Sequence, residues 1–296
     1  MSNRFLDTNS GIAFYHTVIK LPDNTIGNHS FAFKGIHKRY LEKLLFQLES
    51  CYTLDVLCYS ILGSQAHFII AQYNAGEEDV TLSDAALRYQ QYYSKKEKPD
   101  ARSIEVRKFR KRLNDLSMFM RDIQRRFTFW YNKQFPQKRR GSLWNPRYKS
   151  TCLKTATALA ECMKYVEFAP VRSNFEHYPG NYPFCSWYHI SQSDFLGSNL
   201  EMKIRQALFY MHRNDPVILS EEEIYYDYSG DLKLAEMAAR DGLEIKELDP
   251  EFSDHLLEES EFWSESKYIE GDEELVGVGF GTVRPRQKKI SVEKDY

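Results

Sequence analysis

The sequence LDVLCYSILGSQAHFIIAQ, residues Leu54–Gln72, decides the fold of this chain. Two runs rich in apolar, β-branched and aromatic residues, Leu54–Leu62 and Ala66–Gln72, are separated by the turn-forming pair Gly63-Ser64. Runs of this length and composition indicate strands, and a short connection that contains glycine joins two antiparallel strands into a hairpin. We therefore predict that an antiparallel sheet forms the centre of the molecule.

The segments around the hairpin predict the order β-α-β-β-α-β-α. Upstream, Gly11–Lys20 has strand composition, and Ile36–Leu48 repeats its apolar residues at helical spacing. The expected elements downstream are a short helix near Ser83–Tyr92, a long helix over Arg102–Gln134, a strand at Arg147–Lys154 and a helix at Thr155–Phe168. This order favours the α+β class, with a ferredoxin-like antiparallel sheet and helices packed on one face.

The charge of the chain divides it into two parts. Residues 1–196 hold 28 Lys and Arg against 18 Asp and Glu, a balance of +10, whereas residues 197–296 hold 12 against 24, a balance of -12. Helical spacing at Glu201–Met211 and Asp231–Arg240 predicts that the acidic part is mainly helical. We therefore expect a domain at 1–196 and an acidic C-terminal region of unknown function at 197–296.

Composition excludes several classes of protein. The chain has 296 residues, 42% hydrophobic and 28% charged, which is typical of a folded globular protein and excludes disorder over most of the length. The N-terminal residues lack a basic segment followed by an apolar one, and no apolar stretch is long enough to span a bilayer. Five cysteines without C-x-x-C spacing indicate neither disulfides nor zinc. These features predict a cytoplasmic protein with no membrane partner.

The segment between Arg102 and Lys149 carries most of the positive charge. It holds 15 basic residues against Glu105, Asp115 and Asp122. Such a balance favours a polyanionic partner, and a solvated helix face is the alternative that composition leaves open. Aromatic rings alternate with the cations, and holding unpaired nucleotides requires both. The predicted DNA-binding residues are Arg121, Arg125, Arg126, Lys138, Arg139, Arg140, Trp144, Arg147 and Lys149.

Two further positions are candidates for chemistry. Gln65 and His67 lie two residues apart on a predicted strand, so both side chains point to the same face and can reach one metal ion. Tyr165 lies on the flank of the predicted helix Thr155–Phe168, where its hydroxyl can face a cleft. Tyrosine can attack a phosphodiester when a metal polarises the phosphate. The alternative for each is an ordinary packing role, since the chain has 20 tyrosines.

Several blocks in the same order resemble the single-tyrosine (HUH-type) transposases of bacterial insertion sequences, particularly the REP-associated tyrosine transposases. The likeness covers about Phe14–Leu196. It includes the basic, aromatic segment Phe119–Ser150, the block YVEFAPVRSNF at Tyr165–Phe175, which resembles Y-I-H-x-N-P-V-R, and NYPFCSWYHI at Asn181–Ile190, which resembles D-Y-P-W-S-S-Y.

The resemblance implies a function and a site. Members of this family bind DNA hairpins and single strands, usually as dimers. A His-x-His pair on a central strand holds Mg or Mn, and a helix-borne tyrosine attacks the phosphodiester to leave a 5′-phosphotyrosine link. By position, Tyr165 resembles that nucleophile, and Gln65 and His67 resemble the metal ligands.

This chain departs from the family pattern at two ligands. Gln65 replaces the first histidine of P-N-H-x-H, and Ala169 replaces the polar residue that usually follows the tyrosine by four positions. A neutral amide is a weaker ligand for Mg than an anion, so we expect reduced metal occupancy unless Glu161 or His16 substitutes.

Three hypotheses for the function stay open at this point. The chain cuts single-stranded DNA beside a hairpin, or it is a domesticated, non-catalytic regulator that binds nucleic acid, or it is an RNA-binding module with a similar sheet. The sequence leaves open whether it is an enzyme. The acidic C-terminal region either covers the basic surface or serves dimerisation or solubility.

Overall fold

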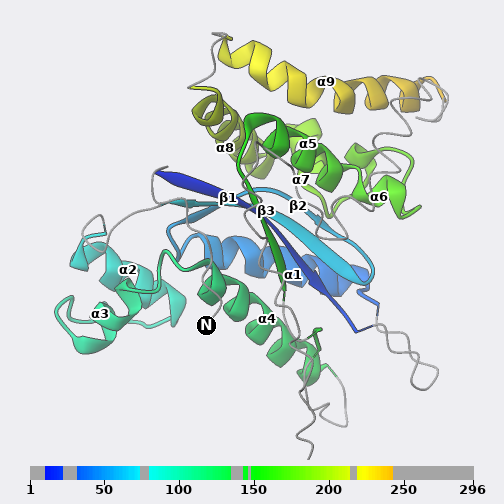
Figure 1. Cartoon of the computed structure of the whole chain (residues 1–296). Helices are drawn as coiled ribbons and strands as arrows, with labels where there is room; N and C mark the ends of the chain where they lie inside the picture. The colour runs from blue at the N-terminus through cyan, green and yellow to red at the C-terminus, as the bar shows by residue number, and fades with distance from the viewer. Residues whose placement is uncertain are drawn as a thin grey trace, which may run out of the picture.

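A four-stranded antiparallel sheet lies at the centre of the computed structural model, which describes residues 11–22, 32–73, 80–134, 143–145, 148–213 and 219–242 (Figure 1). The strands are β1 (Ile12–Lys20), β2 (Leu54–Ile61), β3 (Gln65–Tyr73) and β4 (Lys149–Leu153). Their order is β2-β3-β1-β4, and each neighbouring pair is antiparallel. The predicted hairpin, the α+β class and the ferredoxin-like strand order are confirmed.

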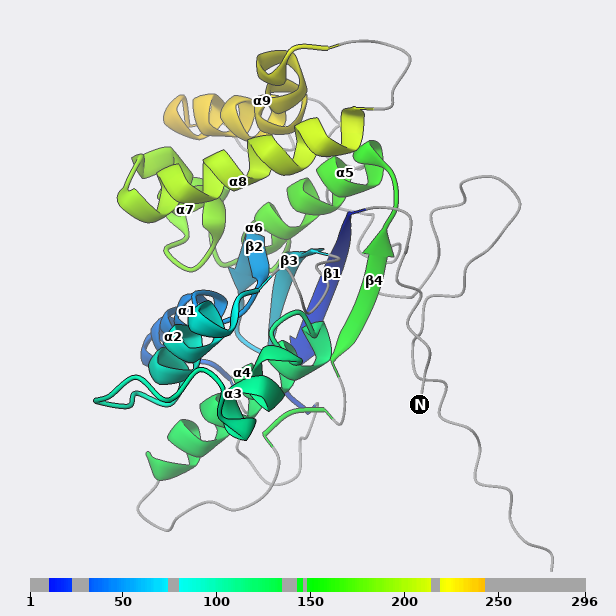
Figure 2. The same ribbon diagram turned by 90° about the vertical axis from the view of Figure 1, so that its left-hand side faces the viewer.

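The two crossover helices lie on one face of this sheet, as predicted. They are α1 (Gly35–Glu49) and α4 (Leu116–Lys133), and the short helices α2 (Leu82–Tyr92) and α3 (Ile104–Arg110) lie on the same side (Figure 2). The hydroxyl of Thr17 on β1 contacts the sulfur of Met120 on α4 at 3.8 Å. Thr17 therefore points toward α4.

The predicted long helix over Arg102–Gln134 is wrong, because the chain turns between α3 and α4. The carboxylate of Asp115 accepts hydrogen bonds from the backbone N–H groups of Ser117 and Met118, which caps the start of a new helix. Two separate helices therefore carry basic residues of this segment, Arg107, Lys108 and Arg110 on α3 and Arg121, Arg125, Arg126 and Lys133 on α4.

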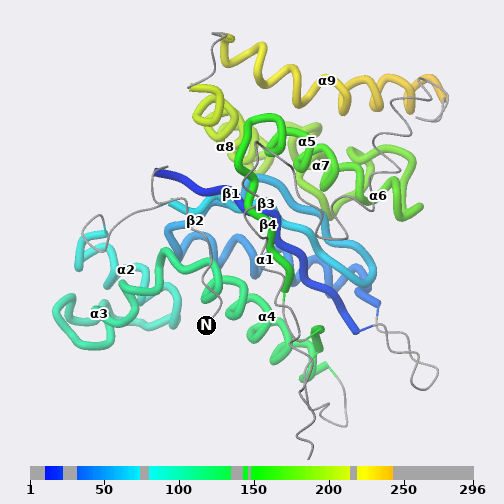
Figure 3. The backbone as a smooth tube through the Cα atoms, viewed as in Figure 1, coloured from blue at the N-terminus to red at the C-terminus, as the bar shows by residue number. Residues whose placement is uncertain are grey.

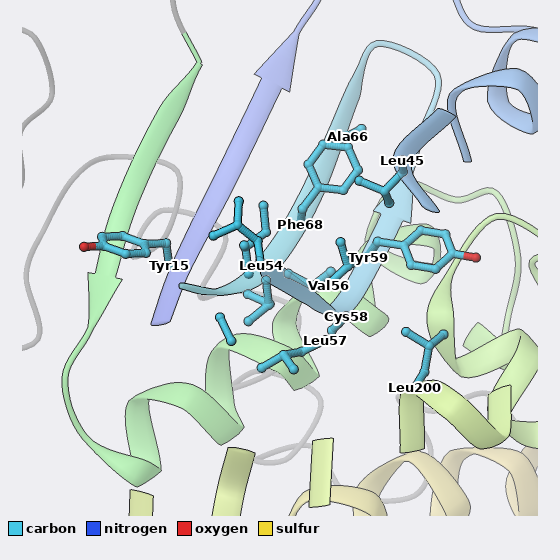
Figure 4. Close-up of a cluster of buried hydrophobic side chains, with 14 of the residues drawn as sticks. Tyr15, Leu45, Leu54, Val56, Leu57, Cys58, Tyr59, Ala66, Phe68 and Leu200 are labelled. Atoms are coloured by element: carbon cyan, nitrogen blue, oxygen red, sulfur yellow. The ribbon is translucent and has the colours of Figure 1, made fainter. Parts of the chain in front are cut away.

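Helices also cover the opposite face, a layer that the order of the elements did not indicate. They are α5 (Ala156–Glu167), α6 (Ala169–Arg172), α7 (Ser186–Gln192), α8 (Phe195–His212) and α9 (Glu221–Arg240) (Figure 1). Figure 4 shows Leu45 and Phe68 on one side of the β2–β3 hairpin and Leu57 and Leu200 on the other. The hairpin is apolar on both faces because helices pack on both.

Helices α8 and α9 pack against the residues before 197. Nζ of Lys203 on α8 lies 2.7 Å from Oε1 of Glu49 on α1. At Gly197, a Cβ atom would lie only 2.0 Å from the carbonyl oxygen of His189 on α7, so the two helices meet where a side chain has no room. The predicted domain boundary stays a prediction, and the acidic stretch 244–274 lies outside the described residues.

Candidate functional site

The register of β1 and β3 brings two histidines together on the α5 face of the sheet. Val18 of β1 pairs with His67 of β3, and His16 lies two residues before Val18, so the side chains of His16 and His67 share that face. Nε2 of His16 and Nδ1 of His67 lie 3.1 Å apart, and the two rings are nearly parallel. Both side chains are buried. The sheet therefore supplies a hydrogen-bonded pair of imidazoles.

Tyr165 of α5 completes this cluster. Its ring meets both imidazoles edge-on, with centroid distances of 6.1 Å to His16 and 5.9 Å to His67. The guanidinium carbon of Arg172 on α6 lies 3.8 Å from the centroid of the Tyr165 ring, and Nη2 of Arg172 donates to the Tyr165 carbonyl at 2.5 Å. Tyr165 as a whole is 7% exposed. We name His16, His67, Tyr165 and Arg172 the imidazole–phenol site.

Burial sets the charge of the imidazole–phenol site. It lowers the pKa of His16 to about 3, with a further contribution from the positive charge of Arg172. Burial also lowers the pKa of His67 well below its usual range. Burial raises the pKa of the Tyr165 phenol, and Arg172 opposes that rise. At neutral pH the site therefore contains two neutral imidazoles, a protonated phenol and one fixed cation.

The donors of this site do not fit Mg or Mn. Nε2 of His67 is buried without a hydrogen-bond partner in the part of the chain that the structure describes. Gln65 begins β3 on the same face and is partly exposed, and Ala169 is buried at the start of α6. Within the described ranges no three His, Cys, Asp or Glu residues form a group that could hold a metal ion. Mg and Mn prefer oxygen ligands, whereas the contacts that the structure gives for the two imidazoles are with each other and with the Tyr165 ring.

A groove of about 1100 Å³ lies along α4, on the other face of the sheet. The arginines that line it are Arg112, Arg121, Arg125 and Arg126, and the aromatic residues are Tyr40, Tyr92, Tyr93, Phe129 and Trp144. We name this set the α4 groove. It combines cations that can bind phosphates with rings that can stack on bases.

The arginines of the α4 groove fall into two kinds. Arg112 contacts the buried carboxylate of Asp122, and the guanidinium of Arg126 lies over the ring of Tyr92 at 4.0 Å and donates to the Tyr92 carbonyl at 2.8 Å. Arg121 and Arg125 are exposed, and neither forms an ion pair within the part of the chain that the structure describes. These two arginines can meet an anion from solution without breaking an internal contact.

Aromatic residues of the groove also differ from one another. Trp144 is 5% exposed, packs on Phe33 and Phe127, and its indole N–H donates to the carbonyl of Gln124 at 2.9 Å. Phe129 is 65% exposed, with Nζ of Lys133 over its ring at 4.1 Å. The Trp144 ring belongs to the aromatic core, so a base contact by Trp144 would require this ring to leave its packing.

The structure brings together some of the predicted site residues and separates others. Tyr165 and His67 meet, whereas the arginines of α4 lie beyond the sheet from both, as the paths of α4 and α5 in Figure 3 show. Lys149 is exposed at the start of the edge strand β4. Lys138, Arg139, Arg140 and Arg147 lie outside the described residues. His16, which the sequence offered only as a substitute ligand, is the second imidazole of the site.

Comparisons with known proteins give one structural likeness. No family model matches the chain, and no curated protein matches it by sequence. A solved structure of a REP-associated tyrosine transposase bound to a REP hairpin is similar to this chain, with a TM-score of 0.42 and 12% identity, over 75% of this chain and 96% of that chain. Among the described helices, none is long and apolar enough to cross a bilayer.

Proposed function

We propose that this chain is a transposase-like DNA-binding protein that binds hairpin or single-stranded DNA through the α4 groove. The observation that carries the proposal is the pair Arg121 and Arg125, exposed and without ion pairs among the described residues, beside the exposed rings of Tyr93 and Phe129. Phosphates of a flexible strand bind such cations, and unpaired bases stack on such rings.

Binding by the α4 groove can be tested with fluorescence anisotropy on a labelled hairpin that carries single-stranded flanks. The variant Arg121→Ala/Arg125→Ala should weaken binding at least about tenfold at low salt and reduce the slope of log affinity against log salt by about 1.4, since each phosphate contact to a single strand contributes about 0.7. The control Lys233→Ala/Arg240→Ala removes the same charge from exposed positions of α9. Equal losses in both variants would contradict a binding role for the groove, and tighter binding of an RNA of the same sequence would favour the RNA-binding alternative.

Attack by Tyr165 on a phosphodiester is the second candidate function. The observation that favours it is the phenol beside two neutral imidazoles and a guanidinium. In this reaction the phenol oxygen bonds to the phosphorus and gives up its proton, and the 3′-oxygen of the broken ester leaves and takes up a proton. The product is a 5′-phosphotyrosine link. Arg172 can stabilise the negative charge on the phosphate as the bond forms.

Cleavage is tested by searching for a covalent protein–DNA adduct on a denaturing gel, with Mg, with Mn and with a chelator. We expect an adduct in the native chain that is lost in Tyr165→Phe, with unchanged affinity for DNA. Lack of an adduct under all three conditions, together with intact binding, would leave the non-catalytic regulator as the function. Because Mg and Mn do not fit the donors, we expect the chelator to change the yield little.

A homodimer, which the resemblance implies, is tested by the mass of the complex in solution.

A further inference from the structure

We propose that helix α9 positions the tyrosine helix α5, so that the C-terminal part of the chain belongs to the machinery of the imidazole–phenol site. Two residues of α9, Tyr228 and Asp231, contact the two buried ionisable residues of α5, Lys164 and Glu167, that flank Tyr165. The consequence for chemistry rests on the proposed attack by Tyr165, whereas the packing itself does not.

The first contact between α5 and α9 is an ion pair. Lys164 is 6% exposed, and its Nζ lies 2.8 Å from Oδ2 of Asp231 and 3.0 Å from Oε1 of Glu161. A buried ammonium is costly unless anions compensate for the water it has lost. Of its two anions, Glu161 belongs to the same helix as Lys164, so Asp231 is the one that ties α5 to α9.

The second contact is a buried carboxylate. Glu167 is fully buried and accepts hydrogen bonds from Ser186 Oγ at 2.5 Å, from the Trp187 N–H at 2.9 Å and from the Tyr228 hydroxyl at 3.3 Å. Ser186 and Trp187 begin α7, so this one side chain connects α5 with α7 and α9. Each of these donors compensates part of the cost of burying the carboxylate.

Helical spacing makes the two contacts act together. Lys164 and Glu167 are three residues apart on α5, and Tyr228 and Asp231 are three residues apart on α9, so each pair shares one helix face. Two points of attachment fix the rotation of α5 about its axis, which a single contact cannot do. That rotation decides where the Tyr165 ring meets the imidazoles, because Tyr165 lies between the two attachment points.

The inference can be tested in the full chain with the variant Tyr228→Phe/Asp231→Asn. The first change removes only the hydroxyl of Tyr228, and the second removes the negative charge of Asp231 at nearly the same size. The matched control is Tyr226→Phe/Asp227→Asn, which makes the same two changes at exposed positions of the same helix. The first readout is hydrogen exchange. We expect the amides of α5 to exchange at least about tenfold faster in the first variant, with the amides of β1, β3 and α4 unchanged.

The second readout compares DNA binding with adduct formation. In Tyr228→Phe/Asp231→Asn we expect unchanged affinity at the α4 groove and a several-fold lower yield of the Tyr165 adduct. The single variant Tyr228→Phe should lose less of the adduct yield than the double variant. Exchange at α5 equal to the control, or a uniform rise through all helices, would overturn the positioning role. If the native chain forms no adduct, the attack by Tyr165 fails as a function while the exchange experiment still decides the role of α9.

Discussion

The α4 groove and the imidazole–phenol site lie on opposite faces of one sheet, and they differ in exposure and charge. The groove is open and positively charged, with two arginines free to meet an anion, whereas the second site is closed and holds neutral imidazoles and a protonated phenol. The adjacent residues His16 and Thr17 point to these two faces. The sheet therefore separates an exposed cationic surface on one side from a buried, neutral cluster on the other.

The separation also restricts how one polynucleotide can reach both places. The β2 edge of the sheet is occupied by the segment before α7. Cys185 forms an isolated antiparallel β-bridge with Ser60, and the backbone N–H of Ile61 donates to the carbonyl of Phe184. The other edge is β4, with the exposed Lys149 at its start. We therefore expect a strand that is bound in the groove and cut at Tyr165 to pass around β4.

The largest effect should come from the floor of the groove. Trp144→Ala should lower the free energy of unfolding by about 3–5 kcal/mol, because it leaves a cavity among Phe33 and Phe127. Urea denaturation measures this value, and Phe129→Ala at the exposed rim should change it by less than about 0.5 kcal/mol. Similar values for the two variants would contradict the distinction between a packed floor and an exposed rim.

A pH effect comes next, at Glu167 on the closed face. Burial raises the pKa of this carboxyl to about 7, so its contribution to stability is complete below about pH 4.5 and is lost as the pH rises through about 7. Relative to Glu167→Gln, the native chain should lose on the order of 3 kcal/mol of unfolding free energy between pH 4.5 and pH 8. If the unfolding free energies of the two proteins changed in parallel with pH, the Glu167 carboxyl would be in contact with water, which would contradict its burial in the structure.

The imidazole pair should respond to pH in the opposite direction. Because burial lowers the pKa of His16 to about 3, its contribution to stability is present above about pH 6.5 and is lost as the pH falls toward 3. Between pH 6.5 and pH 4.5 the native chain should lose on the order of 2 kcal/mol relative to His16→Gln, measured by denaturation at each pH. If the native chain lost no more unfolding free energy than His16→Gln over this pH range, the imidazole of His16 would be solvated rather than buried.

The smallest effect concerns the exposed ring of the groove. Phe129→Ala should weaken binding of a single strand by about 1 kcal/mol, which is roughly fivefold, because one base loses its stacking partner. Phe195→Ala, at a 92% exposed position of α8, is the matched control and should leave the affinity unchanged. An equal loss in both variants would place base stacking elsewhere on the protein.

The hairpin and the order of the elements could be predicted because each is a local pattern. The break at Asp115 was missed, since the apolar residues on both sides of it continue at helical spacing and the capping carboxylate is one residue. The helical layer over the second face was also missed, because an apolar stripe shows that a helix is buried but not which face of a sheet it covers.

The sites depended even more on three-dimensional information. The contact between His16 and His67 follows from the register of β1 and β3, which the sequence of either strand alone does not contain. Arg125 and Tyr165 are separated by β4 in the chain, and the turn into α5 places them on different faces. The resemblance to a family pointed to Tyr165 and His67, and the position of His16 beside them became visible only in the folded chain.

The close approach at Gly197 has a consequence for anyone who mutates or divides this protein. With only 2.0 Å between a would-be methyl group and the backbone oxygen of His189, even alanine would wedge α7 and α8 apart. A saturation scan should therefore find residue 197 intolerant of every replacement, in contrast to its exposed neighbour Phe195. Fragments that end at residue 197 would lose the packing of α8 against α7 that this glycine permits.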